Sequence, residues 1–172
     1  MIKLTSDKQI PRKAYNEVED LLGWNYHYFL QRGSYEIETG DLELAKNFLE
    51  QARAMSSNDY MVQTAWAYMT LKRAAQNPTS MNSNPDAEEA IQQLEEAISA
   101  RGKTDYYPYH VLGSQGLSWS RRALISTEQK NKLLSRLRWA VNQGITNHPY
   151  EAHLKQLGLD IEREYLMTAV PK

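Results

Sequence analysis

The 172-residue sequence contains no cysteine, which excludes disulfide bonds and thiol chemistry. Chains without cysteine are consistent with a reducing compartment, and we expect a cytoplasmic protein. The sequence also lacks the apolar run of a secretory signal at its start and any stretch near the roughly 20 apolar residues that a membrane-spanning helix needs. We therefore expect a soluble protein with no membrane partner.

The sequence has no strong excess of charge of either sign. Its 20 basic and 21 acidic residues give a formal net charge of -1. No global field attracts such a chain to nucleic acid or to anionic lipid, so binding of either would need a local cluster of positive charge.

Runs of valine, isoleucine and threonine that alternate with polar residues are missing as well. Leucine, alanine, glutamate, glutamine, lysine and arginine instead recur with helical spacing over long stretches. The sequence predicts an all-α fold, and residues 1–172 are long enough for a single domain with a core that needs no metal.

Glycine, proline and capping residues divide the chain into seven or eight expected helices, depending on whether Gly23 breaks the first. The boundary signals are Pro11 at the start of the first helix, Gly40 and Asp41 between Thr39 and Leu42, Asn58 or Asp59 before a helix to Gln76, Asn84 with Pro85, Gly102, Thr104 or Asp105, Ser126 with Gln129, Gly144 as a terminator, and Pro149 before the last helix.

Alternate helices repeat two patterns. Small residues recur at intervals of 34 to 46 residues, at Gly33, Ala67, Gly113 and Gly158. The partner helices carry apolar residues at i, i+4 and i+7, in Ala45-Leu49-Ala52, Ala90-Leu94-Ala97 and Leu133-Leu137-Ala140. A small residue lets the apolar stripe of the next helix approach closely, so we expect stacked helical hairpins in which Gly113 and Gly158 face a neighbouring helix.

This pattern resembles the tetratricopeptide repeat (TPR), W-x2-L-G-x2-Y followed by A-x3-F and a closing alanine and proline. The best match lies in residues 29–52, with Phe29 at the first aromatic place, Gly33 at the glycine, and Leu49 and Ala52 in the second helix.

The repeats depart from the family pattern. In the best match, Arg32 replaces the leucine, Glu36 the tyrosine and Ser57 the proline, and the later units carry insertions of about ten residues between paired helices. Another α-solenoid or a helical bundle remains the alternative.

The resemblance implies antiparallel hairpins stacked as a right-handed α-solenoid. The expected parts are a capping segment at 1–23, repeats at 24–57, 58–103 (with a long loop at 77–85) and 104–146, and a capping helix at 147–172. Similar repeats are often appended to larger signalling NTPases of the STAND type. The resemblance therefore also implies a sensor or scaffold portion of a larger protein.

Tetratricopeptide proteins usually bind partner peptides in a concave groove lined by the first helix of each pair. The resemblance thus implies a non-enzymatic protein-interaction module. Matched by place, the partner-binding residues are His27, Ser34, Thr64, Tyr68, Lys72, Tyr107, His110 and Ser114. Tyrosine and hydroxyl groups would make this groove neutral and amphipathic. The alternative for each aromatic residue is a place in the core.

The stretch HVLGSQGLSW, from His110 to Trp119, raises the question of a serine nucleophile. GSQG does not match the G-x-S-x-G elbow and follows no strand, so close packing at Gly113 and Gly116 is the better interpretation. The four histidines have no metal-binding spacing, and no phosphate-binding loop is present. We expect no catalytic residue, no metal and no cofactor.

Residues 121–138 form a second candidate surface, with six basic residues against one acidic residue. Binding of nucleic acid or of an acidic partner through this span is the alternative function. Its main basic residues are Arg121, Arg122, Lys132, Arg136 and Arg138. A helix that carries Glu88, Glu89, Glu95 and Glu96 offers a competing explanation, because it could pair with the basic span within one molecule or between molecules.

Overall fold

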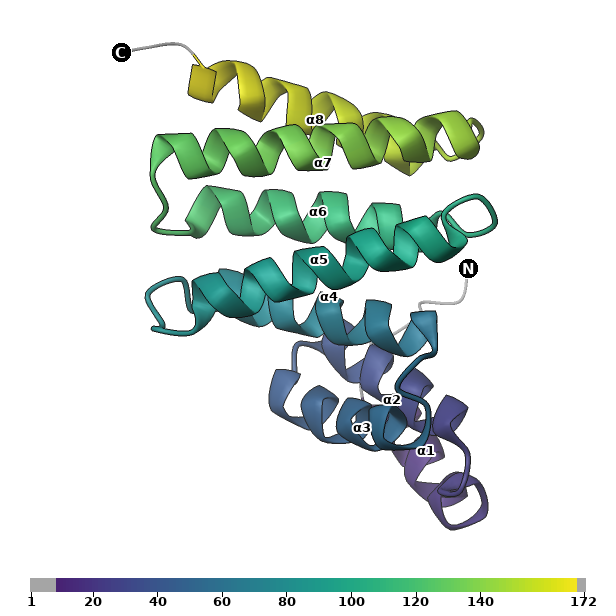
Figure 1. Ribbon diagram of the computed structural model, residues 1–172. Helices are drawn as coiled ribbons and strands as arrows, with labels where there is room; N and C mark the ends of the chain where they lie inside the picture. Colours follow the sequence, from purple (N-terminus) through teal and green to yellow (C-terminus); the bar gives the residue numbers. More distant parts are fainter. Residues whose placement is uncertain (1–8, 170–172) are drawn as a thin grey trace, which may run out of the picture. The chain divides into compact units, whose positions relative to one another are not determined.

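The structure is a computed structural model that describes residues 9–169, and within them the fold is all-α. The described residues form eight helices and no strand (Figure 1). The helices are α1 (Gln9–Leu22), α2 (Tyr26–Thr39), α3 (Leu42–Met55), α4 (Tyr60–Gln76), α5 (Ser83–Arg101), α6 (Tyr107–Arg122), α7 (Thr127–Asn147) and α8 (Ala152–Ala169). None of them has the length and apolar character that a membrane crossing requires.

The strongest capping signals of the sequence act as expected. Gly40 ends α2 with a φ of 91°, a left-handed conformation that favours glycine, and its N–H donates to the carbonyl oxygens of Glu36 and Ile37. The Asp41 side chain then accepts from the N–H of Leu44 and starts α3. Ser126 and Gln129 form the reciprocal capping box at the start of α7. Local hydrogen bonds therefore fix these helix ends.

Three expected helix boundaries are wrong. Asn84 is not an N-cap, because α5 already begins at Ser83 and the connection before it spans 77–82. Gly144 does not end α7, which continues to Asn147. A Cβ at Gly144 would lie 2.9 Å from Cγ of Tyr109, so the glycine makes room for that ring. Pro149 lies in a turn, and α8 begins at Ala152.

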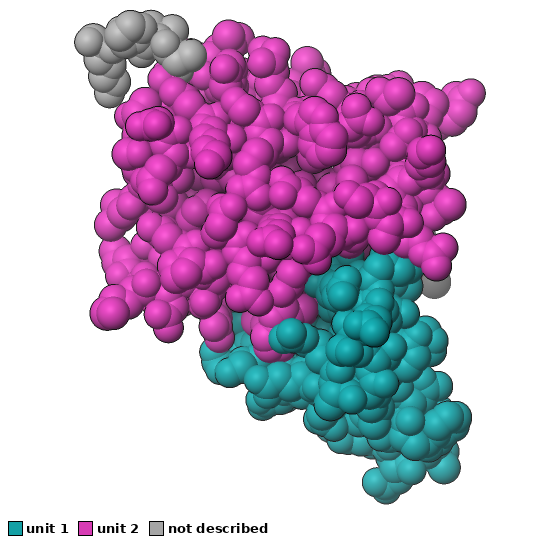
Figure 2. Space-filling view, in the orientation of Figure 1, with its two compact units in different colours: residues 1–65 teal, residues 66–172 magenta. Residues whose placement is uncertain are grey.

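The chain divides into two compact units, residues 1–65 and 66–172 (Figure 2). In the first unit, α2 packs along α3. Gly33 lies so close to α3 that a Cβ there would be 2.7 Å from Cδ2 of Leu49, and the rings of Phe29 and Phe48 stack with centroids 6.4 Å apart. Phe29, Gly33 and Leu49, which carry the best sequence match, thus meet between two adjacent helices.

In the second unit, α5 packs on α6, and α6, α7 and α8 pack on one another, with connections at alternating ends (Figure 1). Leu94, Leu112, Leu134, Leu137 and Leu154 are buried in one hydrophobic core. That core has the consecutive-helix packing expected of a helical-repeat domain.

The prediction that Gly113 and Gly158 face neighbouring helices is confirmed. A Cβ at Gly113 would lie 2.5 Å from Cδ2 of Leu157 and 2.7 Å from Cγ2 of Val141. A Cβ at Gly158 would lie 3.2 Å from Cδ1 of Ile145. Gly113 therefore lies at a close contact of α6 with both α7 and α8.

Candidate functional site

Five of the eight expected partner-binding residues lie in the second unit, on α4 and α6. Tyr107, His110 and Ser114 have the i, i+3, i+7 spacing of one face of α6, and Tyr68 and Lys72 are one turn apart on α4. All five are half-buried. Tyr68 and Tyr107 pack against the same core, which is the alternative place that the sequence left open for the aromatic residues.

These side chains combine an apolar base with polar tips. Lys72 Nζ lies 5.4 Å from the centroid of the Tyr68 ring, within the range of a cation–π contact. Ser114 Oγ makes a 3.5 Å hydrogen bond to the carbonyl oxygen of Val111. The face of α6 thus presents rings and hydrogen-bonding groups on a packed helix.

His153 continues this face onto α8, although the sequence gave it no role. Its ring and that of His110 meet edge to face with centroids 6.4 Å apart. His148, which lies shortly before His153 in the sequence, is elsewhere in the structure, with Nε2 2.6 Å from the carbonyl oxygen of Gly102. The two histidines differ in which helix each one contacts. The spacing of residues in the sequence does not show these contacts, so it could not have identified His153.

His27, Ser34 and Thr64 lie in the first unit. His27 is exposed and its ring lies against that of Tyr26, with centroids 4.0 Å apart. Ser34 is half-buried. Thr64 is only 1% exposed and its hydroxyl donates to the carbonyl oxygen of Tyr60 at 2.7 Å, so its polar atom is already bonded within α4.

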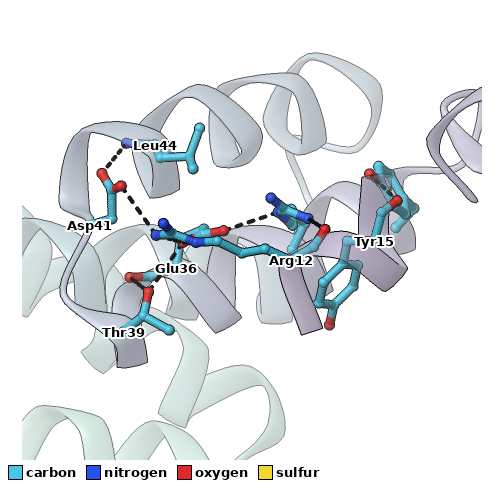
Figure 3. A network of polar contacts seen from close by, with 8 residues as sticks. Arg12, Tyr15, Glu36, Thr39, Asp41 and Leu44 are labelled. Atoms are coloured by element: carbon cyan, nitrogen blue, oxygen red, sulfur yellow. Dashed lines mark hydrogen bonds and ion pairs between the residues drawn. The ribbon is translucent and has the colours of Figure 1, made fainter. Parts of the chain in front are cut away.

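A buried polar network in the first unit joins the two residues that depart most from the repeat pattern (Figure 3). Arg32 Nε and Glu36 Oε1 form an ion pair at 3.1 Å, and their side chains are 4% and 0% exposed. Arg12 of α1 donates from Nε to Glu36 Oε2 at 3.0 Å and from Nη2 to Asp41 at 3.2 Å. Thr39 also donates to Glu36 Oε2. These bonds explain how a carboxylate is buried at this position.

Aromatic rings enclose the Arg32 guanidinium. Its Cζ lies 5.1 Å from the ring centroids of both Tyr15 and Phe48. Arg32 Nη1 donates to the carbonyl oxygen of Arg12 at 3.0 Å. The hydrogen bond with Glu36 raises the pKa of Arg12 above its ordinary value, so the protonated form of Arg12 is favoured even more strongly. The network holds α1 on the α2–α3 hairpin. We therefore assign it a role in the stability of the fold.

The basic span at 121–138 is largely paired with carboxylates of the same molecule. Arg136 of α7 binds Glu88 at 2.5 Å and Glu95 at 2.9 Å on α5. Hydrogen bonds to Glu95, and then to Glu88, raise the pKa of Arg136 despite its partial burial. The intramolecular pairing that the acidic helix suggested is thus observed.

Helix α8 supplies the remaining acidic partners. Glu164 accepts from Arg121 at 2.8 Å and from Lys130 at 2.7 Å, and Glu162 pairs with Arg138 at 2.5 Å. The sequence did not reveal these pairs, because Glu164 lies on a separate helix, 43 positions after Arg121 and 34 after Lys130. Arg122 donates to the carbonyl oxygen of Ala75 at 3.4 Å. Four of the six cations of the basic span are thus paired with carboxylates, whereas Arg122 binds a neutral carbonyl and Lys132 has no ion pair within the described residues.

A hollow of about 350 Å³ lies where α5 and α7 begin and α6 ends. Its apolar lining consists of Pro85, Trp119, Ile125 and Leu133, and Lys132 and Arg136 are its cations. The sequence placed Lys132 and Arg136 in the basic span but gave no sign that Trp119 lines the same hollow. The only indication of this hollow in the sequence was the position of Trp119 near the end of an expected helix.

Over residues 9–169, no three histidine, aspartate or glutamate side chains gather as ligands for a metal ion. Comparison of the chain with protein-family models, with curated proteins and with solved structures gave no match. The fold and the surfaces above are therefore the basis for inferring a function.

Proposed function

We propose that this chain is a non-enzymatic protein-interaction module of tetratricopeptide-like hairpins, which binds a segment of a partner protein. The observation that carries the proposal is the row of Tyr107, His110 and Ser114 along one face of α6, which His153 of α8 continues, while Tyr68 of α4 packs against the same core as Tyr107. We call these five residues the α6 face.

The chemistry of the α6 face suits a peptide better than a small polar substrate. Tyrosine offers a large contact area and a hydrogen bond at modest entropic cost, and histidine and serine add groups that donate and accept. Because the bodies of Tyr68 and Tyr107 pack on the core, they are pre-organised for binding. We extend the proposal to a sensor or scaffold role within a larger signalling protein of the STAND type.

Site-specific photocrosslinking tests the proposal. A photoreactive phenylalanine analogue is placed at Ser114 on the α6 face, and at Ser135, an exposed residue of α7, as the matched control. In cells, the analogue at Ser114 should capture a defined protein that the analogue at Ser135 does not. The same set of captured proteins at both positions would contradict the proposal.

Purified components then test the affinity. The captured partner should bind wild-type protein, and the double change Tyr68→Ala and Tyr107→Ala should weaken binding by about tenfold or more, as for aromatic anchors of interfaces. Circular dichroism melting must show that the variant is folded. Equal binding by a folded variant would remove the α6 face from the proposal.

A further inference from the structure

A second hollow, of about 420 Å³, lies where α5 and α7 end and α6 begins (Figure 1). We call it the Trp139 hollow, because Trp139 of α7 lines it and is 57% exposed. Tryptophan side chains are highly buried on average in folded proteins. The volume of the hollow lies within the range for pockets that bind organic molecules. The open indole ring therefore offers a surface on which a planar part of a ligand can stack.

Gln143 adds hydrogen-bonding groups next to this ring. It lies one turn after Trp139 on the same face of α7, is exposed, and lines the same hollow. Its amide both donates and accepts hydrogen bonds, which suits the edge of a nucleobase. Stacking of a base on an exposed aromatic ring is the main contact by which many proteins hold single-stranded nucleic acid. The end of α7 thus combines a stacking surface with a group that can bond to the edge of a base.

The charges that line the Trp139 hollow are positive. Arg101, at the end of α5, and Lys103, in the α5–α6 connection, line it, and no aspartate or glutamate of the described residues does. Lys103 is exposed and has no ion pair in the part of the chain that the structure describes. The acidic residue of the same connection, Asp105, does not line the hollow, and its Oδ1 accepts from the backbone N–H of Tyr107 at 2.9 Å. The lining therefore favours an anionic ligand.

Hydrogen bonds hold the backbone that carries Lys103. The N–H of Thr104 donates to the carbonyl oxygen of Arg101 at 2.9 Å, which closes a turn around Lys103. On the other side, His148 Nε2 lies 2.6 Å from the carbonyl oxygen of Gly102 and ties the turn to the end of α7. The loop is thus formed before a ligand binds, which lowers the entropic cost of binding.

We propose that the Trp139 hollow binds one nucleotide unit, that is, an aromatic base that carries a phosphate. The base stacks on Trp139 and bonds through its edge to Gln143, and the phosphate pairs with Lys103. The assignment is independent of the α6 face and of the basic span, because no residue of that face and no cation of that span lines this hollow. It adds a nucleotide site to the proposed interaction module.

Titration of the full chain with adenosine monophosphate (AMP), adenosine and ribose phosphate tests the proposal. Nuclear magnetic resonance of the indole N–H groups gives the readout, and the Trp139→Phe variant identifies the signal of Trp139. We expect AMP to shift this signal and to bind about tenfold more tightly than adenosine, which lacks the charged phosphate. AMP should also bind about tenfold more tightly than ribose phosphate, which lacks the base that stacks.

Exposed lysines provide matched variants. Lys103→Gln should lower the AMP affinity about fivefold and leave the adenosine affinity unchanged, since a charge-assisted contact is lost. Lys155→Gln, at an exposed lysine of α8 that does not line the hollow, should change neither affinity. Equal affinity for AMP and adenosine, equal effects of the two lysine variants, an unmoved Trp139 signal, or no binding in the millimolar range would each overturn the proposal.

The variant Trp139→Ala tests the stacking surface. It should lower the affinity for AMP and for adenosine about tenfold, because both ligands lose the same stacked contact. Most of the Trp139 side chain is exposed, so we expect the variant to keep its fold, which circular dichroism melting checks. Unchanged affinity for both ligands in a folded variant would overturn the placement of the base.

Two further ligands define the source of the nucleotide unit. Phenyl phosphate joins an aromatic ring to a phosphate but has no base edge, and tighter binding of it than of AMP would overturn the nucleotide and assign the hollow to a phosphorylated aromatic side chain. A short single-stranded oligoadenylate RNA carries the same unit within a strand. Tighter binding of this RNA than of AMP supports a nucleotide of a strand, and tighter binding of AMP supports a free nucleotide.

Discussion

Arg32 and Glu36 lie one turn apart on α2 and form an ion pair that is almost completely buried. Arg32 stands where the repeat pattern that the surrounding sequence resembles has leucine, and Glu36 stands where it has tyrosine. A single replacement would have left a charge in the core without a partner, whereas the two together form an ion pair, and the Glu36 carboxylate also accepts hydrogen bonds from Arg12 and Thr39.

Glu36→Gln should therefore destabilise the protein strongly, because it leaves the buried Arg32 without a counter-charge. We expect the free energy of unfolding to fall by about 3 kcal/mol in chemical denaturation. The double change Arg32→Leu and Glu36→Leu should recover much of that loss, because an apolar pair needs no counter-charge. The exposed pair of Lys46 and Glu50 gives a control, and Lys46→Ala should cost less than about 0.5 kcal/mol.

Gly113→Ala tests the close approach of α6 to α7 and α8. The new methyl group would overlap Leu157 and Val141, and we expect a loss of about 1–3 kcal/mol in the free energy of unfolding. Gly158→Ala is the matched change at a looser contact, where the better helix propensity of alanine offsets the strain and leaves stability nearly unchanged. A larger loss at Gly158 than at Gly113 would contradict the packing described for α6.

Gly40→Ala should destabilise the protein by about 1 kcal/mol, because residues with a side chain disfavour the positive φ that ends α2. Asparagine tolerates this conformation better than alanine does. Gly40→Asn should consequently lie between wild type and Gly40→Ala in thermal denaturation. Equal stability of all three proteins would show that the left-handed cap is unimportant.

Glu164 makes the stability of the second unit depend on acidity. Burial raises the pKa of its carboxyl, but hydrogen bonds from Lys130 and Arg121 outweigh it and hold the pKa below the ordinary 4.5. Because the folded-state pKa is the lower one, the stabilisation is complete above pH 4.5 and is lost as the pH falls through the folded-state value.

The variant Glu164→Gln isolates this contribution. In denaturation series at several pH values, wild type should be more stable than the variant at neutral pH, and the difference should shrink in acid. A difference that stays constant down to the lowest pH would show that the two ion pairs do not stabilise the fold.

The sequence predicted those features that depend on neighbours along the chain. The caps at Gly40, Asp41 and Ser126 and the packing role of Gly113 follow from local hydrogen bonds and from helical spacing. The error at Gly144 has a physical cause, since this glycine is retained inside a helix for the ring of Tyr109, which belongs to another helix.

The surfaces were harder to predict than the helices, because their properties depend on which helices meet. Glu162 and Glu164 neutralise much of the basic span only because α8 lies beside α7. The hollow above Trp119 likewise needs three helix ends in one place. The spacing of residues along one helix does not show which other helices it will contact. The sequence therefore predicted neither the ion pairs with α8 nor the hollow.

The bond from Arg12 to Glu36 also specifies the orientation of α1. A helix held only by apolar contacts can shift or rotate against the helices beneath it at little cost in free energy. A guanidinium and a carboxylate, in contrast, form hydrogen bonds in only a few geometries. We therefore expect α1 to keep a single rotational setting about its own axis, and added salt to weaken that setting little, because the Glu36 carboxylate is buried.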